Sequence, residues 1–105
     1  MTDYAQTVTT VDSEEAALAL ARSAVEERLA ACAQVSGPIT SVYRWEGRTE
    51  TAREWQVAFK TTAEAYPELE AHIKARHGYD VPEILLIPVT TGNAAYLAWI
   101  DEETR

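Results

Sequence analysis

A long extended segment is the feature that most restricts how this chain can fold. An amphipathic helix pattern passes directly into residues 32–46, CAQVSGPITSVYRWE, which we interpret as one strand. At about 3.3 Å per residue this strand would span roughly 50 Å. A chain of 105 residues should have a radius of gyration of about 13 Å, which is too small to contain it. Part of the strand must therefore extend beyond the body of the domain.

The overhanging part of this strand predicts self-association. It carries Val42, Tyr43 and Trp45, and an uncovered apolar strand edge is a template for aggregation unless another chain covers it. Aromatic residues are enriched in interface cores, so packing between subunits would account for most of the area of Tyr43, Trp45 and Trp99. We therefore expect a specific oligomer.

The chain before the long strand predicts one strand and one helix. Residues 4–11, YAQTVTTV, combine β-forming and polar residues and favour a polar first strand. Asp12 stands three residues before Glu15, which resembles a capping box and predicts the start of a helix. The apolar stripe from Leu18 to Leu29 has helical spacing, so this face should pack on a sheet.

The long strand should continue into a hairpin with one interruption. Gly37 and Pro38 predict a bulge or a sheet edge, because proline cannot donate to a strand ladder. Residues 46–48 form the expected turn. Residues 54–60, EWQVAFK, then alternate apolar and polar side chains more clearly than any other segment, and indicate a returning antiparallel strand.

The last third of the chain predicts a helix, a strand and a short helix. Residues 63–76 form the helix, with Pro67 tolerated in its first turn. The continuous apolar run ILLIPV, residues 84–89, indicates a central strand. Asn93 should cap the final short helix.

This order of elements predicts an α+β fold. It is the split β-α-β arrangement of a ferredoxin-like sandwich, formed by a single domain of residues 1–105 with its helices on one face of an antiparallel sheet. The other face would be open to water in an isolated domain. We expect other subunits to cover it.

Composition and charge exclude several classes of function. Seventeen acidic and nine basic residues give a net charge of −8, which repels nucleic-acid backbones and anionic lipids. The start MTDYAQTVTT lacks a basic region followed by an apolar run, and no stretch approaches the ~20 apolar residues of a membrane span. A single cysteine cannot form an internal disulfide, which suits a reducing compartment. We expect a cytoplasmic protein with no nucleic-acid or membrane partner.

Five sequence blocks resemble those of a known family. The blocks ARSAVEERLAACAQV, SVYRWEGR, EWQVAFKTT, HGYDVPEIL and YLAWI are similar, in order and spacing, to the signatures of the CutA divalent-cation tolerance proteins. The resemblance implies a subunit that assembles through its long hairpin into a PII-like homotrimer, and an association with tolerance of copper and other divalent metals. The chain departs from the family pattern at Gly78, where the family commonly has proline, and in its polar first strand.

Cys32 is the first candidate metal ligand. It matches the cysteine of the family motif LAAC, and a thiolate is a soft ligand for Cu(I) or Zn(II). A lone cysteine beside alanines also fits the role of a small buried hydrophobe. Copper(I) needs two or three soft donors and Met1 is the only methionine, so a metal site would need help from another subunit.

The sequence gives weaker evidence for a functional role of the two histidines. Their five-residue separation does not place His72 and His77 on one helical face, and we expect His72 to flank solvent. His77 lies in the turn HGYDVPE. It would either stabilise the carbonyl end of the preceding helix or face a cleft shared with Glu83, and both residues are candidate metal ligands.

Lys60 predicts a second kind of site. A lysine at the end of a strand is usually solvated, but this one should lie where several aromatic segments converge. A cation among aromatic rings beside Glu83 would bind an anion or another small ligand. The expected intersubunit cleft comprises Tyr43, Trp45, Lys60, His77, Tyr79, Glu83 and Trp99.

These residues are consistent with three different functions. The chain carries no GxGxxG, P-loop, GxSxG or HExxH motif, so we expect neither an enzyme nor an organic cofactor. The leading hypothesis is a homotrimeric divalent-cation tolerance protein that binds copper or another divalent metal weakly. The alternatives are a PII-like signalling module that binds a small anionic ligand in its intersubunit clefts, and a structural scaffold without a ligand.

Overall fold

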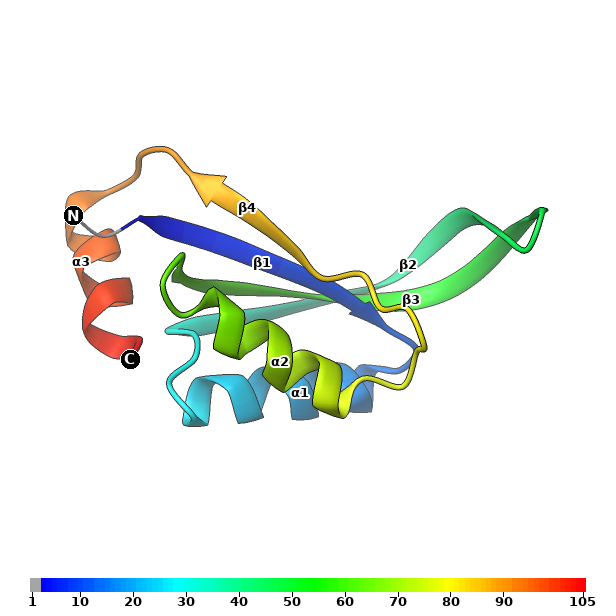
Figure 1. The fold of residues 1–105 in the computed structure, drawn as a ribbon, viewed down its shortest axis with the longest axis horizontal. Coiled ribbons are helices and arrows are strands. Elements are labelled where there is room, and N and C mark those ends of the chain that lie inside the picture. The colour runs from blue at the N-terminus through cyan, green and yellow to red at the C-terminus, as the bar shows by residue number, and fades with distance from the viewer. Residues whose placement is uncertain (1–2) are drawn as a thin grey trace.

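The computed structural model describes residues 3–105, which form four strands and three helices (Figure 1). Their order confirms the predicted α+β fold, and the sheet has the antiparallel strand order β2-β3-β1-β4. The elements are β1 (Tyr4–Val11), α1 (Glu14–Glu26), β2 (Cys32–Trp45), β3 (Arg48–Thr62), α2 (Tyr66–Arg76), β4 (Leu85–Val89) and α3 (Ala94–Glu103).

One face of the sheet packs against α1 and α2, which lie side by side beneath it in Figure 1. Val57 and Phe59 of β3 are fully buried on this face. Successive side chains of a strand point to opposite faces, so Ala58 and Lys60 belong to the other face. Within residues 3–105 this second face carries no helix layer along most of its length, and we call it the open face.

The polar first strand proves to be the middle of the sheet. β1 pairs with β3 on one side and with β4 on the other. Thr7 and Thr9 face the helices and are fully buried, and their hydroxyl groups have no hydrogen-bond partner among residues 3–105. The core therefore contains two unsatisfied hydroxyl groups where a valine would fit.

The prediction that residues 84–89 form a central strand is wrong. β4 is an edge strand of the sheet formed by residues 3–105, and Leu85 and Ile87 keep 52% and 43% of their surface exposed. A continuous apolar run is typical of a strand covered on both faces. No other element of residues 3–105 covers β4 on both faces, so its apolar side chains are exposed to water in the single chain.

Helix α1 has a different N-cap from the one expected. Ser13 is the N-cap, and its side chain accepts a 3.1 Å hydrogen bond from the Ala16 N–H, whereas Asp12 precedes the cap. The helix ends at Glu26. Its apolar stripe packs only in part, because Leu18 and Val25 keep 46% and 37% of their surface exposed.

The hairpin of β2 and β3 confirms the predicted overhang and bulge. The molecule measures 44 Å along its longest axis against 25 and 22 Å along the others, and the hairpin extends away from the helices at one end (Figure 1). The register shifts at Gly37 and Pro38. A Cβ atom at Gly37 would lie 2.7 Å from the Trp55 ring, so the bulge requires glycine. The return strand begins at Arg48, earlier than expected, because its charged first residues do not show the apolar alternation of a half-buried strand.

The other two helices are close to their predicted positions. α2 begins at Tyr66, later than expected, because Ala65 occupies the N-cap position and donates its N–H to the Thr62 hydroxyl at 3.1 Å. Pro67 lies in its first turn, as predicted. Asn93 caps α3, as predicted, by accepting from the Ala95 N–H at 3.0 Å. No helix in residues 3–105 is both long enough and apolar enough to cross a membrane.

We predict that replacing Thr9 with valine stabilises the fold. The two side chains have the same shape, and the change removes a buried hydroxyl that lacks a partner, which costs about 1 to 2 kcal/mol. Urea denaturation at fixed protein concentration measures the change. Thr51→Val, at an exposed position, is the control and should change the free energy of unfolding by less than about 0.5 kcal/mol. A Thr9→Val protein that is less stable than wild type would contradict this account of the core.

Candidate functional site

Cys32 begins β2 on the open face and lies directly opposite Lys60. The strand registers pair Cys32 with Lys60, Lys60 with Gln6, and Gln6 with Ile87, so four directly opposed residues cross all four strands. Directly opposed side chains of neighbouring strands lie about 5 Å apart at their Cβ atoms. We call these four residues the Lys60 row. In order across the sheet, its side chains carry a thiol, an ammonium group, an amide and an aliphatic group.

Two amide oxygens hold the Lys60 ammonium group. Its Nζ atom donates to Gln6 Oε1 at 2.8 Å and to Gln34 Oε1 at 2.9 Å. Gln34 lies two residues beyond Cys32 on β2 and therefore on the same face. The lysine is thus not a freely solvated strand end, because three strands contribute to its position.

Helix α3 adds Tyr96 to this surface. The pKa of the Tyr96 phenol is raised, first by partial burial and then by the charge of, and a hydrogen bond to, Cys32. The ring of Trp99 stacks on it at 5.5 Å between centroids with a tilt of 34°. The thiol, the lysine and two aromatic rings of α3 therefore share one end of the open face.

His77 lies elsewhere and is fully engaged. Its Nδ1 atom accepts from the Tyr79 N–H at 3.1 Å, and its Nε2 atom lies 2.8 Å from the Thr10 carbonyl oxygen, to which it donates. The ring therefore connects the end of α2 to β1. Its hydrogen bonds are not to the carbonyl end of α2, which was one of the two expected roles of His77. A metal ion at either nitrogen would have to replace one of these hydrogen bonds.

Tyr79 and Glu54 form a second connection in the same region. The Tyr79 hydroxyl donates to Glu54 Oε2 at 2.9 Å, and Glu54 is 7% exposed. Partial burial, followed by this hydrogen bond, raises the pKa of Tyr79. The two contacts hold the loop that follows α2 against the base of the hairpin.

The expected cleft residues are therefore divided within a single chain. Thr10, to which His77 is bound, lies four positions along β1 from Gln6, which is about 13 Å. Trp45 pairs with Arg48 at the tip of the hairpin, roughly 40 Å along β3 from Lys60. Within one chain, Lys60 therefore lies apart from the HGYDVPE turn and from Trp45. A cleft that contains all seven residues must combine more than one chain.

The candidate metal ligands are also apart. Residues 3–105 contain no group of three or more His, Cys, Asp or Glu side chains that could hold a metal ion. Cys32 is partly exposed beside Lys60, His77 is bonded to β1, and Glu83 is exposed before β4. Of these three candidates, only Cys32 is placed on the open face by residues 3–105.

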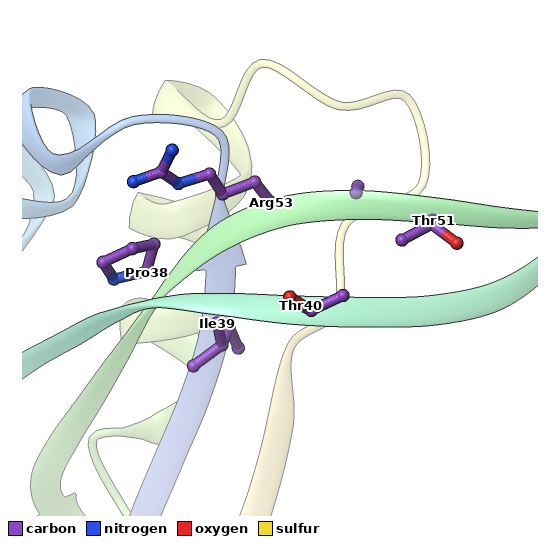
Figure 2. Close-up of a pocket in the computed structure, with 6 residues that line it drawn as sticks. Pro38, Ile39, Thr40, Thr51 and Arg53 are labelled. Atoms are coloured by element: carbon purple, nitrogen blue, oxygen red, sulfur yellow. The ribbon is translucent and has the colours of Figure 1, made fainter.

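A small hollow lies at the base of the overhanging hairpin (Figure 2). Its volume is about 210 Å³, and Pro38 and Ile39 of β2 line it together with Thr51 and Arg53 of β3. Ile39 and Arg53 point to opposite sides of the hairpin (Figure 2). The guanidinium carbon of Arg53 lies 5.7 Å from the centre of the Trp55 ring. The hollow contains none of the predicted site residues.

The sequence has relatives across nearly its whole length. The profile of the CutA1 divalent ion tolerance protein family matches residues 5–103. The divalent-cation tolerance protein CutA of Thermus thermophilus is 46% identical over 95 residues, which are 90% of this chain and 92% of that protein. A solved structure of the divalent cation tolerance protein Cut A1 from the same organism has a TM-score of 0.95 at 43% identity, covering 97% of this chain and 99% of that one.

The chain belongs to the CutA1 divalent ion tolerance family. This confirms the family resemblance of the five sequence blocks. A longer relative, the chloroplastic CutA 1 protein of Oryza sativa, is 43% identical over 96 residues, and the chain spans 54% of its length.

Sequence reasoning missed three residues of the Lys60 site in this CutA1 family member. Gln6, Gln34 and Tyr96 hold or flank Lys60 and Cys32. A glutamine in a strand normally indicates a solvated position. The two-residue period of β2 could have identified Gln34, because it places this residue on the same face as Cys32. No local pattern predicts the strand register that places Gln6 opposite Lys60.

The expectation that His72 flanks solvent is wrong. His72 is 8% exposed between α2 and α1, and its Nε2 atom lies 2.8 Å from the Ser23 hydroxyl oxygen. That hydroxyl donates to the Leu20 carbonyl at 3.0 Å, so His72 is the donor in their contact. The partner is 49 positions away along the chain, which is why the local pattern did not reveal it.

We predict that His72 makes the fold less stable in acid. Burial and the charge of Arg76 lower its pKa below the usual 6.5, and Glu27 opposes them in part. The unfolded chain therefore binds a proton first, so stability falls as the pH decreases below about 6.5 and levels off below the folded pKa. Thermal unfolding of wild type and His72→Gln between pH 7.5 and 5 measures this, because a glutamine Nε2 can still donate to Ser23 without titrating. Identical pH profiles for the two proteins would contradict the assignment.

Proposed function

We propose that this protein acts in tolerance of divalent cations, as a cytoplasmic homotrimer that binds copper or another divalent metal rather than as an enzyme. The observation that carries the proposal is the family match over residues 5–103. The acidic charge of −8 supports it, because the summed field attracts cations and repels polyanions.

The distribution of exposed apolar side chains supports assembly. Large hydrophobic residues with more than a third of their surface exposed occur on the hairpin, on β4 and on α3. Exposed apolar side chains that gather on one element, as they do on each of these three, mark interaction surfaces. The residues are Val42, Tyr43, Trp45, Leu85, Leu86, Ile87, Tyr96 and Trp99. Three chains of charge −8 repel one another, so packing and strand pairing must hold the trimer together.

Trp45→Glu should therefore disrupt the trimer. The substitution would bury an unpaired charge in the interface and weaken assembly by several kcal/mol, on the order of other interface anchors. Sedimentation at low micromolar concentration should give wild type a mass near three times 11.6 kDa and the variant a lower mass. Trp45→Tyr keeps an aromatic ring and is the control. A wild-type mass near one chain, or a trimeric Trp45→Glu protein, would contradict the proposed interface.

Cys32 supports the metal role, because it places a partly exposed soft donor on the open face. Further donors must come from neighbouring chains, since residues 3–105 assemble no complete set. Glu83 is the more available of the other two candidates. His77 would first have to release the Tyr79 N–H or the Thr10 carbonyl.

Copper titration tests this role directly. We expect Cys32→Ala to weaken the binding of Cu(I) to the trimer by at least about tenfold, because the soft donor is lost. Isothermal titration against a competing chelator measures affinity and stoichiometry, and Glu83→Gln tests the second ligand. His72→Gln, which alters a histidine enclosed between two helices, is the control and should bind copper as wild type does. Unchanged stoichiometry and affinity in Cys32→Ala would remove Cys32 from the mechanism.

A specific observation also favours the second candidate function, a PII-like module for a small anionic ligand. The two glutamine oxygens hold the Lys60 ammonium group in place on the open face. A cation bound at Cys32 would lie close to this positive charge, whereas an anion would be attracted by it. A structural scaffold without a ligand is the outcome if neither metals nor anions bind.

A further inference from the structure

The contacts of Lys60 determine how its two glutamine neighbours are oriented. An ammonium group can only donate hydrogen bonds, so the amides of Gln6 and Gln34 must turn their oxygen atoms toward it. Their NH₂ groups are then directed away from Nζ. A third N–H of the ammonium group remains beyond the two that the amides accept. The Lys60 site therefore offers one free ammonium N–H and one positive charge, with the amide NH₂ groups of two glutamines nearby on the open face.

We propose that the Lys60 site binds the carboxylate group of a small molecule whose remaining part is apolar. Lys60, Gln6 and Gln34 donate hydrogen bonds to the two carboxylate oxygens, and the apolar part lies toward β4 and α3. The inference names the ligand class for the anion-binding function proposed above and rests on it.

The charge of the site favours a carboxylate over other ligands. Lys60 provides one positive charge and both glutamines are neutral, which matches a monoanion. Phosphate, which carries a charge between −1 and −2 at neutral pH, would be poorly compensated in a chain of net charge −8. A metal ion would meet N–H groups and an ammonium group where it needs lone pairs. Two adjacent oxygens of one carboxylate can accept from the ammonium group and an amide together.

The surroundings of the site favour an apolar body. Ile87 lies directly opposite Gln6, and Leu85 is its neighbour on the same face of β4. Their exposed fractions are 43% and 52%. On the other side, Tyr96 adjoins Cys32, and the Trp99 ring stacks on Tyr96. A ligand with a small aromatic or branched aliphatic body would contact part of this apolar surface, between one chain and the subunit that packs on it, while its carboxylate faces Lys60.

Assembly into a trimer would make a bound anion beside Lys60 more favourable. Subunits that pack on the apolar parts of the open face remove water from the Lys60 ammonium group. A charge without water or an opposite charge is costly. Amide oxygens satisfy two of its donors but leave its charge uncompensated. A bound carboxylate supplies the missing charge without a further acidic residue.

Titration calorimetry with three matched probes tests the proposal. Benzoate carries the carboxylate, benzamide has the same shape without charge, and phenyl phosphate carries the other common anion. We expect wild type to bind benzoate at least about tenfold more tightly than either of the others, since charge-assisted hydrogen bonds to the carboxylate are lost or mismatched. Equal or tighter binding of benzamide or phenyl phosphate overturns the ligand class.

Substitutions locate the site. Lys60→Met removes the charge and should weaken benzoate binding by about tenfold or more. Gln34→Glu keeps a partner for Lys60, which protects the fold, but replaces N–H donors with a carboxylate and should weaken binding similarly. Lys74→Met removes an exposed lysine of α2 and is the control. Benzoate affinity that is unchanged in both Lys60→Met and Gln34→Glu overturns the assignment of the site.

Copper titration of the same preparations separates this proposal from the metal role. Wild type that binds copper but not benzoate overturns the carboxylate site and leaves the metal role standing. Lys60→Met that loses benzoate but keeps copper supports a distinct carboxylate site. Wild type that binds benzoate but no copper supports the carboxylate site and removes the metal role.

Discussion

The structure depends on the pairing of β1 with a neighbour on each side. β1 joins the long β3 to the short β4, and its side chains meet the helices on one face and the Lys60 row on the other. This central position places Thr7 and Thr9 in the core at the cost of two unsatisfied hydroxyl groups. It also leaves β2 and β4 as the edges of the sheet in residues 3–105, so the chain exposes both unpaired strand backbones and apolar side chains. Those edges are where a second copy gains most from contact.

The sequence predicts those parts of the fold that local chemistry determines. Asn93 caps a helix, Pro67 enters a first turn, and Gly37 with Pro38 interrupts a strand, because each residue acts on its own backbone. The positions of β1 and β4 could not be predicted from hydrophobicity, since topology places a polar strand in the middle and an apolar strand at the edge. A hydrophobic run indicates that its residues are buried in the functional form of the protein. An assembly buries surfaces that a single chain leaves exposed.

The candidate site was predicted less completely because it depends on register. Local patterns identify Cys32 and Lys60 as separate candidates, but only the pairing of β2 with β3 places them opposite each other. A shift of one residue would turn Lys60 to the helix face and remove the site. His77 shows the same limit in another form, since its partner Thr10 lies 67 positions away in the sequence. Long-range contacts of this kind are set by the whole sheet and leave no local pattern.

The neighbourhood of Cys32 and Lys60 connects the two proposed functions. A metal ion at the thiol would lie near the ammonium group, and the repulsion between them would weaken its binding. A carboxylate held by Lys60 would offset that positive charge and so favour a metal ion beside it. By linkage, a bound metal ion would then favour the carboxylate to the same degree. The Lys60 row thus provides a physical reason why the two proposed activities need not be separate, because one lysine would contribute to the affinity for both ligands.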